Sequence, residues 1–221
     1  MMRLLLIDTC AAEGTIALAD TALEPAIVAA EVLPGRTSSE RLVPVVRQLM
    51  EARGWRLSEL AAVVVVHGPG SFTGVRVGLS AAKGLSEAGG VPLIGMSRLA
   101  LLAAAANAGD ATIHAALDAG RGEFYYGEYV GRRCVGETLL TRDALLAAVQ
   151  GGELVACEAK VSDALPARLL PEPVAADALP LALERLERGE VDDAAVLDAN
   201  YLRRTDYELL AKLTVAGHAT S

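Results

Sequence analysis

A glycine-rich loop is the segment of this sequence whose residue types are best suited to chemistry. It contains Gly68, Gly70, Ser71, Thr73, Gly74 and Arg76. A loop of this kind between a strand and a helix can point backbone N–H groups at an anion such as a nucleotide phosphate. The established phosphate-binding patterns are absent, because this loop has neither a Gly-Lys-Ser/Thr ending nor GxGxxG spacing. An anion contact and a tight structural turn both fit these residues, and the sequence leaves the choice open.

Two aspartates that end predicted strands are the carboxylates to consider for metal or nucleotide chemistry. Asp8 ends the first strand of the chain, and Asp118 ends the first strand of its second half. In a duplicated fold this pair would flank the cleft, where two carboxylates can hold a magnesium nucleotide or position a water molecule. Each aspartate also suits a turn, since Asp-Thr and Asp-Ala-Gly are good turn sequences. No phosphate-binding glycine follows Asp8 closely, which counts against catalysis.

The histidines and cysteines do not form a metal-binding pattern. They are His67, His114 and His218, with Cys10, Cys134 and Cys157. No histidine pair has HxxxH or HExxH spacing, and no cysteine pair has CxxC spacing. We therefore predict no metal site and no catalytic residue, although His67 lies beside the glycine loop and could touch a ligand. The odd number of cysteines predicts buried free thiols in a cytoplasmic protein.

Small residues recur at every fourth position of a helix predicted over residues 73–88. Each interior glycine costs about 1 kcal/mol relative to alanine, which a protein tolerates where another backbone must come close. The close partner could be the sheet, another helix of this chain or a second protein. The residues of this helix that we predict to contact a partner are Gly74, Val75, Gly78, Leu79 and Ala82.

A second helix, predicted over residues 37–53, has an apolar stripe and a capping-box pattern at Thr37 and Glu40, and Ser38 or Ser39 could also cap it. The stripe contains Leu42, Val45, Val46 and Leu49. Together the two helices have more apolar or small surface than one face of a sheet can cover. This excess indicates a helix-mediated interface with a partner, and ordinary packing within the chain remains an alternative of similar weight.

The elements that position these residues follow the same order in both halves of the chain. In the first half we expect strands at 4–7, 15–19, 26–32, 62–66 and 91–94, and helices at 37–53, 73–88 and 98–107. In the second half we expect strands at 112–118, 123–130, 133–140 and 154–157, and helices at 141–149, 161–169 and 177–188. The repeated order predicts a duplicated α/β architecture with lobes at 1–107 and 108–221, since residues 107–110 are small and polar.

Composition and charge narrow the function classes. The chain has 221 residues, of which 52% are hydrophobic, and a net charge of −8. It is too apolar to be disordered and too acidic to be a primary nucleic-acid binder. The longest apolar runs, at 60–66 and 99–106, are well short of the roughly 18 residues that a membrane-spanning helix needs. The apolar run after Arg3 is too short for a signal peptide, so we expect a cytoplasmic protein without a membrane partner.

Five segments of the sequence resemble the TsaB family, also called YeaZ, and they occur in the family's order. They are LLLIDTCAAEGTIAL, HGPGSFTGVRVGLSAAKGL, VPLIGMSRLALLA, AALDAGRGEFYYGEY and NYLRR. The pattern GPGSFTGxRxG is highly specific to this family. The resemblance implies the duplicated fold of actin-like ATPases, sugar kinases and ribonuclease H, with a mixed five-stranded sheet flanked by helices in each lobe.

The resemblance also implies a non-catalytic subunit. TsaB pairs with its paralogue TsaD through the first two long helices of each protein. With the ATPase TsaE they install threonylcarbamoyl on the adenosine next to the anticodon of tRNA. TsaD holds its metal through an HxxxH motif on the first long helix, whereas residues 36–41 here read RTSSER. We therefore expect no activity from the isolated chain and only indirect contact with tRNA.

The resemblance leaves other questions open. A homodimer can form when TsaD is absent, and ADP or ATP at the interface with TsaD is neither implied nor excluded. The alternative function is a degenerate phosphotransferase or metallopeptidase of the actin-like fold that has an activity of its own.

Overall fold

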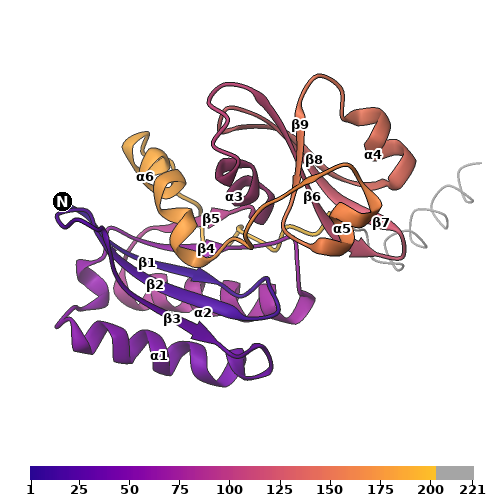
Figure 1. The fold of residues 1–221 in the computed structure, drawn as a ribbon. Coiled ribbons are helices and arrows are strands. Elements are labelled where there is room, and N and C mark those ends of the chain that lie inside the picture. Colours follow the sequence, from indigo (N-terminus) through magenta and orange to yellow (C-terminus); the bar gives the residue numbers. More distant parts are fainter. Residues whose placement is uncertain (203–221) are drawn as a thin grey trace, which may run out of the picture.

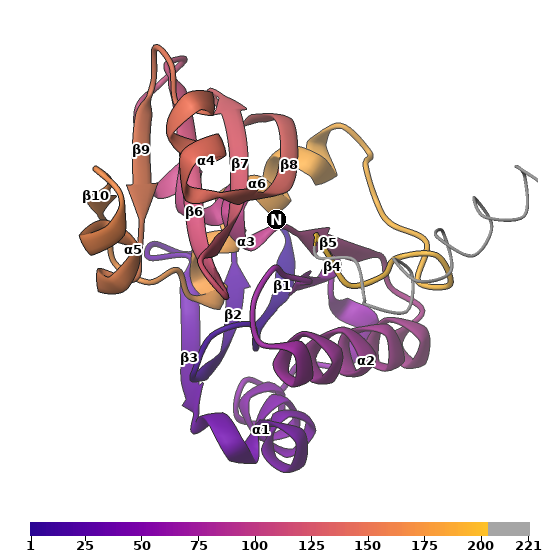
Figure 2. The same cartoon turned by 90° about the vertical axis from the view of Figure 1, so that its right-hand side faces the viewer.

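Two five-stranded mixed sheets form the centres of two lobes in the computed structural model, which describes residues 1–202 (Figures 1 and 2). The first sheet contains β1 (Arg3–Asp8), β2 (Gly14–Asp20), β3 (Ile27–Leu33), β4 (Ala62–Val66) and β5 (Leu93–Met96). The second contains β6 (Thr112–Gly120), β7 (Glu123–Val130), β8 (Arg133–Thr141), β9 (Glu153–Ala156) and β10 (Arg168–Leu169). Both sheets have the same order, β3-β2-β1-β4-β5 and β8-β7-β6-β9-β10, which confirms the predicted duplication.

Six α-helices flank the sheets among the described residues. They are α1 (Ser38–Ala52), α2 (Phe72–Gly89), α3 (Arg98–Ala105), α4 (Arg142–Ala148), α5 (Ala159–Ala164) and α6 (Leu179–Glu187). Short 3-10 helices occur at Gly35–Thr37, Leu57–Glu59 and Ala175–Ala178. No helix within residues 1–202 is long and apolar enough to cross a membrane.

Alternate residues of β1 pack into two separate hydrophobic cores, because successive side chains of a strand point to opposite faces of the sheet. Leu5 and Ile7 pack with α1 and α2 on one face of the sheet. Leu4 and Leu6 pack on the other face with α6, the 3-10 helix before it and one side of α3. The four valines of β4 are fully buried, as the sequence predicted for a central strand.

Helix α3 lies between the lobes and contributes to both cores (Figure 1). Leu101 belongs to the core of the first sheet, whereas Leu99 and Leu102 pack with β6, β7 and β9 of the second sheet. The far face of the second sheet is covered by α4 and α5, with Leu145 and Val161 fully buried there. The two lobes therefore share α3 as a common packing element.

The chain returns to the first lobe after β10. Ala175, Ala178 and Leu179 are buried against the first sheet, so Ala175–Ala178 and α6 belong to the first lobe by packing. This return of the chain differs from the simple division by chain order, in which residues 108–221 make up the second lobe. Residues 203–221 lie outside the described part of the chain.

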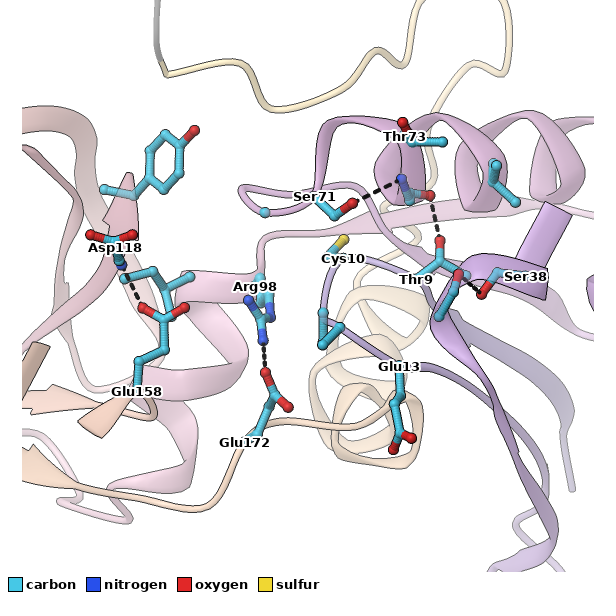
Figure 3. A pocket seen from close by; sticks show the side chains of 18 of the residues that line it. Thr9, Cys10, Glu13, Ser38, Ser71, Thr73, Arg98, Asp118, Glu158 and Glu172 are labelled. Atoms are coloured by element: carbon cyan, nitrogen blue, oxygen red, sulfur yellow. Dashed lines mark hydrogen bonds and ion pairs between the residues drawn. The ribbon is translucent and has the colours of Figure 1, made fainter. Parts of the chain in front are cut away.

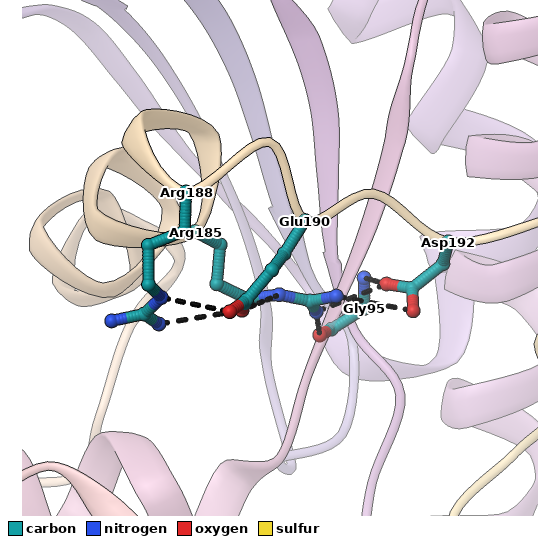
Figure 4. A network of polar contacts seen from close by, with 5 residues as sticks. All are labelled: Gly95, Arg185, Arg188, Glu190 and Asp192. Carbon is teal, nitrogen blue, oxygen red and sulfur yellow. Dashed lines mark hydrogen bonds and ion pairs between the residues drawn. The ribbon is translucent and has the colours of Figure 1, made fainter.

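The segment after α6 is held along the edge of β5 by a polar network (Figure 4). The Asp192 carboxylate accepts hydrogen bonds from the Gly95 backbone N–H at 2.7 Å and from Arg185 Nη1 at 3.0 Å. Arg185 Nη1 also donates to the Gly95 carbonyl at 2.8 Å, and Arg188 pairs with Glu190. This network fixes the path of the chain toward Leu197, which packs over Gly95.

Three predictions about local structure were wrong in detail. Residues 161–169 do not form one helix, because α5 ends at Ala164 and residues 168–169 pair with β9 as β10. Thr37 precedes α1 without capping it, since its hydroxyl donates to the Pro34 carbonyl instead. Cys10 is buried as predicted, but Cys134 is exposed on β8.

Candidate functional site

A cleft of about 1060 Å³ separates the two lobes (Figure 3). The turn after β1, the glycine loop and the start of α1 form one wall, and the end of β6 forms the other. Gly70, Ser71 and Thr73 of the glycine loop line this cleft, whereas Gly68 is buried behind it. The structure therefore brings part of the loop and Asp118 to one cavity. Of the two aspartates that we predicted to flank the cleft, only Asp118 lines it, because Asp8 is buried behind it.

The glycine loop is held against the turn that follows β1. The Ser71 backbone N–H donates to the Cys10 carbonyl at 2.8 Å, and the Thr9 hydroxyl donates to the Gly74 carbonyl at 2.6 Å. A Cβ atom at Gly74 would collide with the Thr9 carbonyl oxygen. The Ser71 side chain accepts from the Gly74 N–H and so caps α2. These contacts account for the glycines and for Ser71 as parts of a tight turn.

The small-residue stripe of α2 continues this close approach along the sheet. A Cβ atom at Gly78 would collide with the Thr9 hydroxyl, and Ala82 is fully buried. Val75 and Leu79 are likewise buried, with exposed fractions of 3% and 6%. The stripe thus faces the first sheet and its loops rather than solvent.

The apolar stripe of α1 is directed inward as well. Leu42, Val45 and Val46 are buried in the same core as Leu79, and Leu49 is half-buried at its edge. Most of the residues that we predicted to contact a partner therefore pack within this chain. The prediction that α1 and α2 form an interface is not decided by this packing, because each helix also has an outer face.

The outer faces of α1 and α2 form a second cavity, a groove of about 590 Å³. Val43 is 49% exposed on α1, and Phe72 is 54% exposed at the start of α2. The groove is lined by Ser39, Leu42, Val43, Phe72, Thr73, Arg76, Val77, Ser80 and Ala81. Sequence reasoning missed most of these residues, although Thr73, Val77 and Ala81 repeat at helical spacing and could have indicated a second face.

Arg76 belongs to this groove and not to the inter-lobe cleft. Its guanidinium carbon lies 3.6 Å from the centre of the Phe72 ring, which is within range for a cation–π contact. Its Nε atom donates to the Tyr201 hydroxyl at 2.7 Å, and the rings of Phe72 and Tyr201 are 5.8 Å apart. The arginine of the loop that could have contacted an anion therefore lies beside two exposed aromatic rings.

The cleft itself is acidic. Among residues 1–202, its lining includes Glu13, Asp118, Glu158 and Glu172 but only one basic side chain, Arg98. Arg98 Nη2 donates to Glu172 at 2.5 Å (Figure 3). Sequence patterns could not indicate this pair, because its two residues are 74 positions apart.

The two predicted aspartates have different surroundings. Asp118 lines the cleft and pairs with Lys160 at 2.7 Å, while its backbone N–H donates to Glu158. Asp8 is only 2% exposed, and burial raises the pKa of its carboxyl despite the hydrogen bond from the Cys10 N–H. Burial likewise raises the pKa of the Cys10 thiol well above its ordinary value, so this cysteine is a poor nucleophile.

The histidines are separated from one another. His67 Nδ1 lies 3.0 Å from the Asp198 carbonyl oxygen, and His114 pairs with the Tyr126 hydroxyl at 2.6 Å inside the second lobe. Burial lowers the pKa of both imidazoles. His218 lies outside the described residues. Within residues 1–202, no group of three or more His, Cys, Asp or Glu side chains is arranged to hold a metal ion.

Two lobes of identical strand order that face each other across a cleft define the class of this protein. They form a duplicated α/β fold, as the family resemblance implies. The structure is similar to YeaZ from Pseudomonas aeruginosa, with a TM-score of 0.76 and 29% identity over 91% of this chain and 100% of that chain. It is also similar, at 30% identity over 92% of this chain and 100% of that one and a TM-score of 0.75, to a Pseudomonas aeruginosa protein described as similar to peptidase YEAZ.

Sequence comparison agrees with this similarity. Residues 32–166 match the family model described as TsaD, tRNA N6-adenosine threonylcarbamoyltransferase. The Escherichia coli (strain K12) tRNA threonylcarbamoyladenosine biosynthesis protein TsaB is 37% identical over 130 residues, which cover 58% of this chain and 55% of that protein. The chain thus spans about half the length of this curated relative. The chain belongs to the TsaB family, also called YeaZ.

Proposed function

We propose that this chain acts in the cytoplasm in the formation of threonylcarbamoyladenosine in tRNA. In this proposal it docks on TsaD and organises it, together with TsaE, without catalysing the transfer itself. The names of its relatives support the pathway, since they include TsaB biosynthesis proteins and, over shorter segments, tRNA N6-adenosine threonylcarbamoyltransferases. The chain would form a homodimer when TsaD is absent and would reach tRNA only through the complex.

The observation that carries this proposal is the apolar groove between α1 and α2. Val43 and Phe72 are two large apolar side chains, each about half exposed, on adjacent helices that the family resemblance assigns to pairing with TsaD. Exposed apolar surface rimmed by polar groups is typical of protein interaction sites, and helices commonly dock into such grooves. The proposed contact is therefore the outer face of both helices and not the inward stripe containing Val45 and Ala82.

The ordering of Arg76 also favours docking. Arginine and aromatic residues contribute most of the binding energy at many interfaces, and side chains already fixed lose less entropy on binding. Here Phe72 and Tyr201 hold the Arg76 guanidinium at the rim of the groove before any partner binds. A carboxylate on the partner would complete the pairing of this cation.

The charges of the cleft support a non-catalytic role. Four carboxylates line it, and only two cations, Arg98 and the Lys160 paired with Asp118, are described beside them, so a nucleotide phosphate would meet net repulsion there. The resemblance implies that TsaD holds its metal through two histidines at the start of its first long helix. The corresponding residues here, 36–41, contain no histidine. The net charge of −8 also makes direct binding of tRNA unfavourable.

Reconstitution of the modification reaction tests this proposal. The purified chain, the TsaD and TsaE of the same organism, ATP, tRNA and threonylcarbamoyl-adenylate are combined, and each protein is omitted in turn. Nucleoside analysis should detect threonylcarbamoyladenosine only when both this chain and TsaD are present. Full modification without this chain would contradict the proposed role. Modification, ATP hydrolysis or peptide hydrolysis by this chain alone would instead favour the phosphotransferase or metallopeptidase alternative.

A further inference from the structure

Three consecutive residues of the NYLRR segment contact three different parts of the molecule. The Asn200 side-chain amide donates to Glu137 of β8 at 2.5 Å, and the Tyr201 hydroxyl accepts from Arg76 of α2 at 2.7 Å. Leu202 packs against the hydrophobic core of the second sheet. Successive side chains are therefore fixed to the second lobe, to the first lobe and to the second lobe again.

Both sides of the Asn200 contact are anchored. The Asn200 backbone N–H donates at 2.8 Å to the carbonyl of His67, which directly follows β4. His67 Nδ1 in turn lies 3.0 Å from the Asp198 carbonyl oxygen, so the backbone before Asn200 is fixed to the first lobe. On the other side, Glu137 also accepts a hydrogen bond from the Tyr129 hydroxyl, and Tyr129 is buried in the second core. Hydrogen bonds to a carboxylate are stronger than those between neutral groups, so this contact can hold the lobes together.

The lobes have few other polar ties on this side. Arg132 of the β7–β8 turn pairs with Glu184 of α6, but both side chains are partly exposed, and exposed ion pairs contribute little. Two lobes that share a packing element, as these share α3, move relative to each other unless their contacts prevent it. None of residues 192–202 lines the cleft, so the segment can restrict the lobes without blocking the cavity.

We propose that Asn200, Tyr201 and Leu202 form a clasp that limits the opening of the inter-lobe cleft and couples it to the groove between α1 and α2. One end of the clasp is held by Arg76, which lines that groove, and the other by Glu137 and the second core. A change in the position of Arg76 therefore alters the hold on Tyr201 and, through its neighbour Asn200, the separation of the lobes. This inference concerns the isolated chain and does not depend on docking to TsaD.

Double electron–electron resonance between spin labels on the two walls of the cleft tests the proposal with the full-length chain alone. The labels are attached through Ser39→Cys on α1 and Ala159→Cys on α5, in a Cys134→Ser/Cys157→Ser background that keeps the buried Cys10. Asn200→Ala and Tyr201→Ala should each broaden the distance distribution and lengthen its mean by at least about 2 Å, the scale of domain rearrangements. Wild-type distances in both variants, with unchanged circular dichroism, would overturn the clasp.

Arg76→Ala tests the coupling to the groove, because Arg76 does not line the cleft. It should widen the distribution as Tyr201→Ala does, and the double variant should widen it no further, since both changes break one contact. Wild-type distances in Arg76→Ala, or additive widening in the double variant, would contradict the coupling. Val196→Ala is the control, because Val196 lies in the same segment with 75% of its surface exposed. It should leave the distances unchanged, and equal widening by this variant would also overturn the proposal.

Discussion

Alanine substitution at two glycines of α2 separates the two explanations for the small-residue stripe. At Gly74 a Cβ atom would overlap the Thr9 carbonyl oxygen, a backbone atom that cannot rotate away. Such overpacking costs about 3 kcal/mol at the upper end of the usual range, against a gain of about 1 kcal/mol in helix propensity. We therefore expect Gly74→Ala to lower the free energy of unfolding by about 2 kcal/mol.

Gly84→Ala is the matched control in the same helix. An added Cβ there meets nothing within 4 Å, so the variant should gain up to about 1 kcal/mol from helix propensity. The two variants should thus differ by about 3 kcal/mol, or roughly 6–12 °C in melting temperature for a chain of this size. Urea and thermal unfolding followed by circular dichroism measure both. A Gly74→Ala variant as stable as Gly84→Ala would refute the packing of α2 on the turn after β1.

Two further perturbations address the second lobe and the segment after α6. Burial lowers the pKa of His114 in the folded chain. As the pH falls, His114 is therefore protonated in the unfolded chain before it is protonated in the folded chain. The contribution of neutral His114 to the free energy of unfolding should be complete above about pH 6.5 and decline below it. In urea unfolding, His114→Gln should therefore reduce the change of this free energy between about pH 7.5 and 5.5. An unchanged slope would exclude His114 as the group responsible. Asp192→Ala removes the carboxylate that accepts hydrogen bonds from Gly95 and Arg185, and it should lower the free energy of unfolding in urea by about 1–2 kcal/mol. A variant as stable as wild type would show that this network does not stabilise the fold.

The order of elements was predictable because local patterns determine it. The four valines of β4 identify a buried central strand within the residue bounds that the structure gives. The meander of three strands that opens each half predicts the duplicated sheets, and these sheets bring Asp118 and the glycine loop to one cleft. Helix ends were found to within one residue for α1 and α2.

The faces of the helices were not predictable in the same way. Leu42 and Val43 are both apolar, and only the position of the sheet decides which of them is buried. The glycines of α2 fit a partner or a close intrachain contact equally well until Thr9 is placed beside them. The return of Ala175–Ala178 to the first sheet and the pairing of Arg98 with Glu172 join residues far apart in the chain, which periodicity cannot indicate.

Affinity for the TsaD of the same organism, measured by isothermal titration calorimetry, tests the proposed docking face most directly. Val43→Glu places a charge in the groove between α1 and α2, and Val135→Glu places the same charge on β8 at nearly equal exposure, 49% and 51%. We predict that Val43→Glu weakens binding at least about a hundredfold, as expected when a charge is buried unpaired at the centre of an interface, and that Val135→Glu binds like wild type. Unchanged affinity of Val43→Glu for TsaD, with the fold intact, would contradict docking through this face.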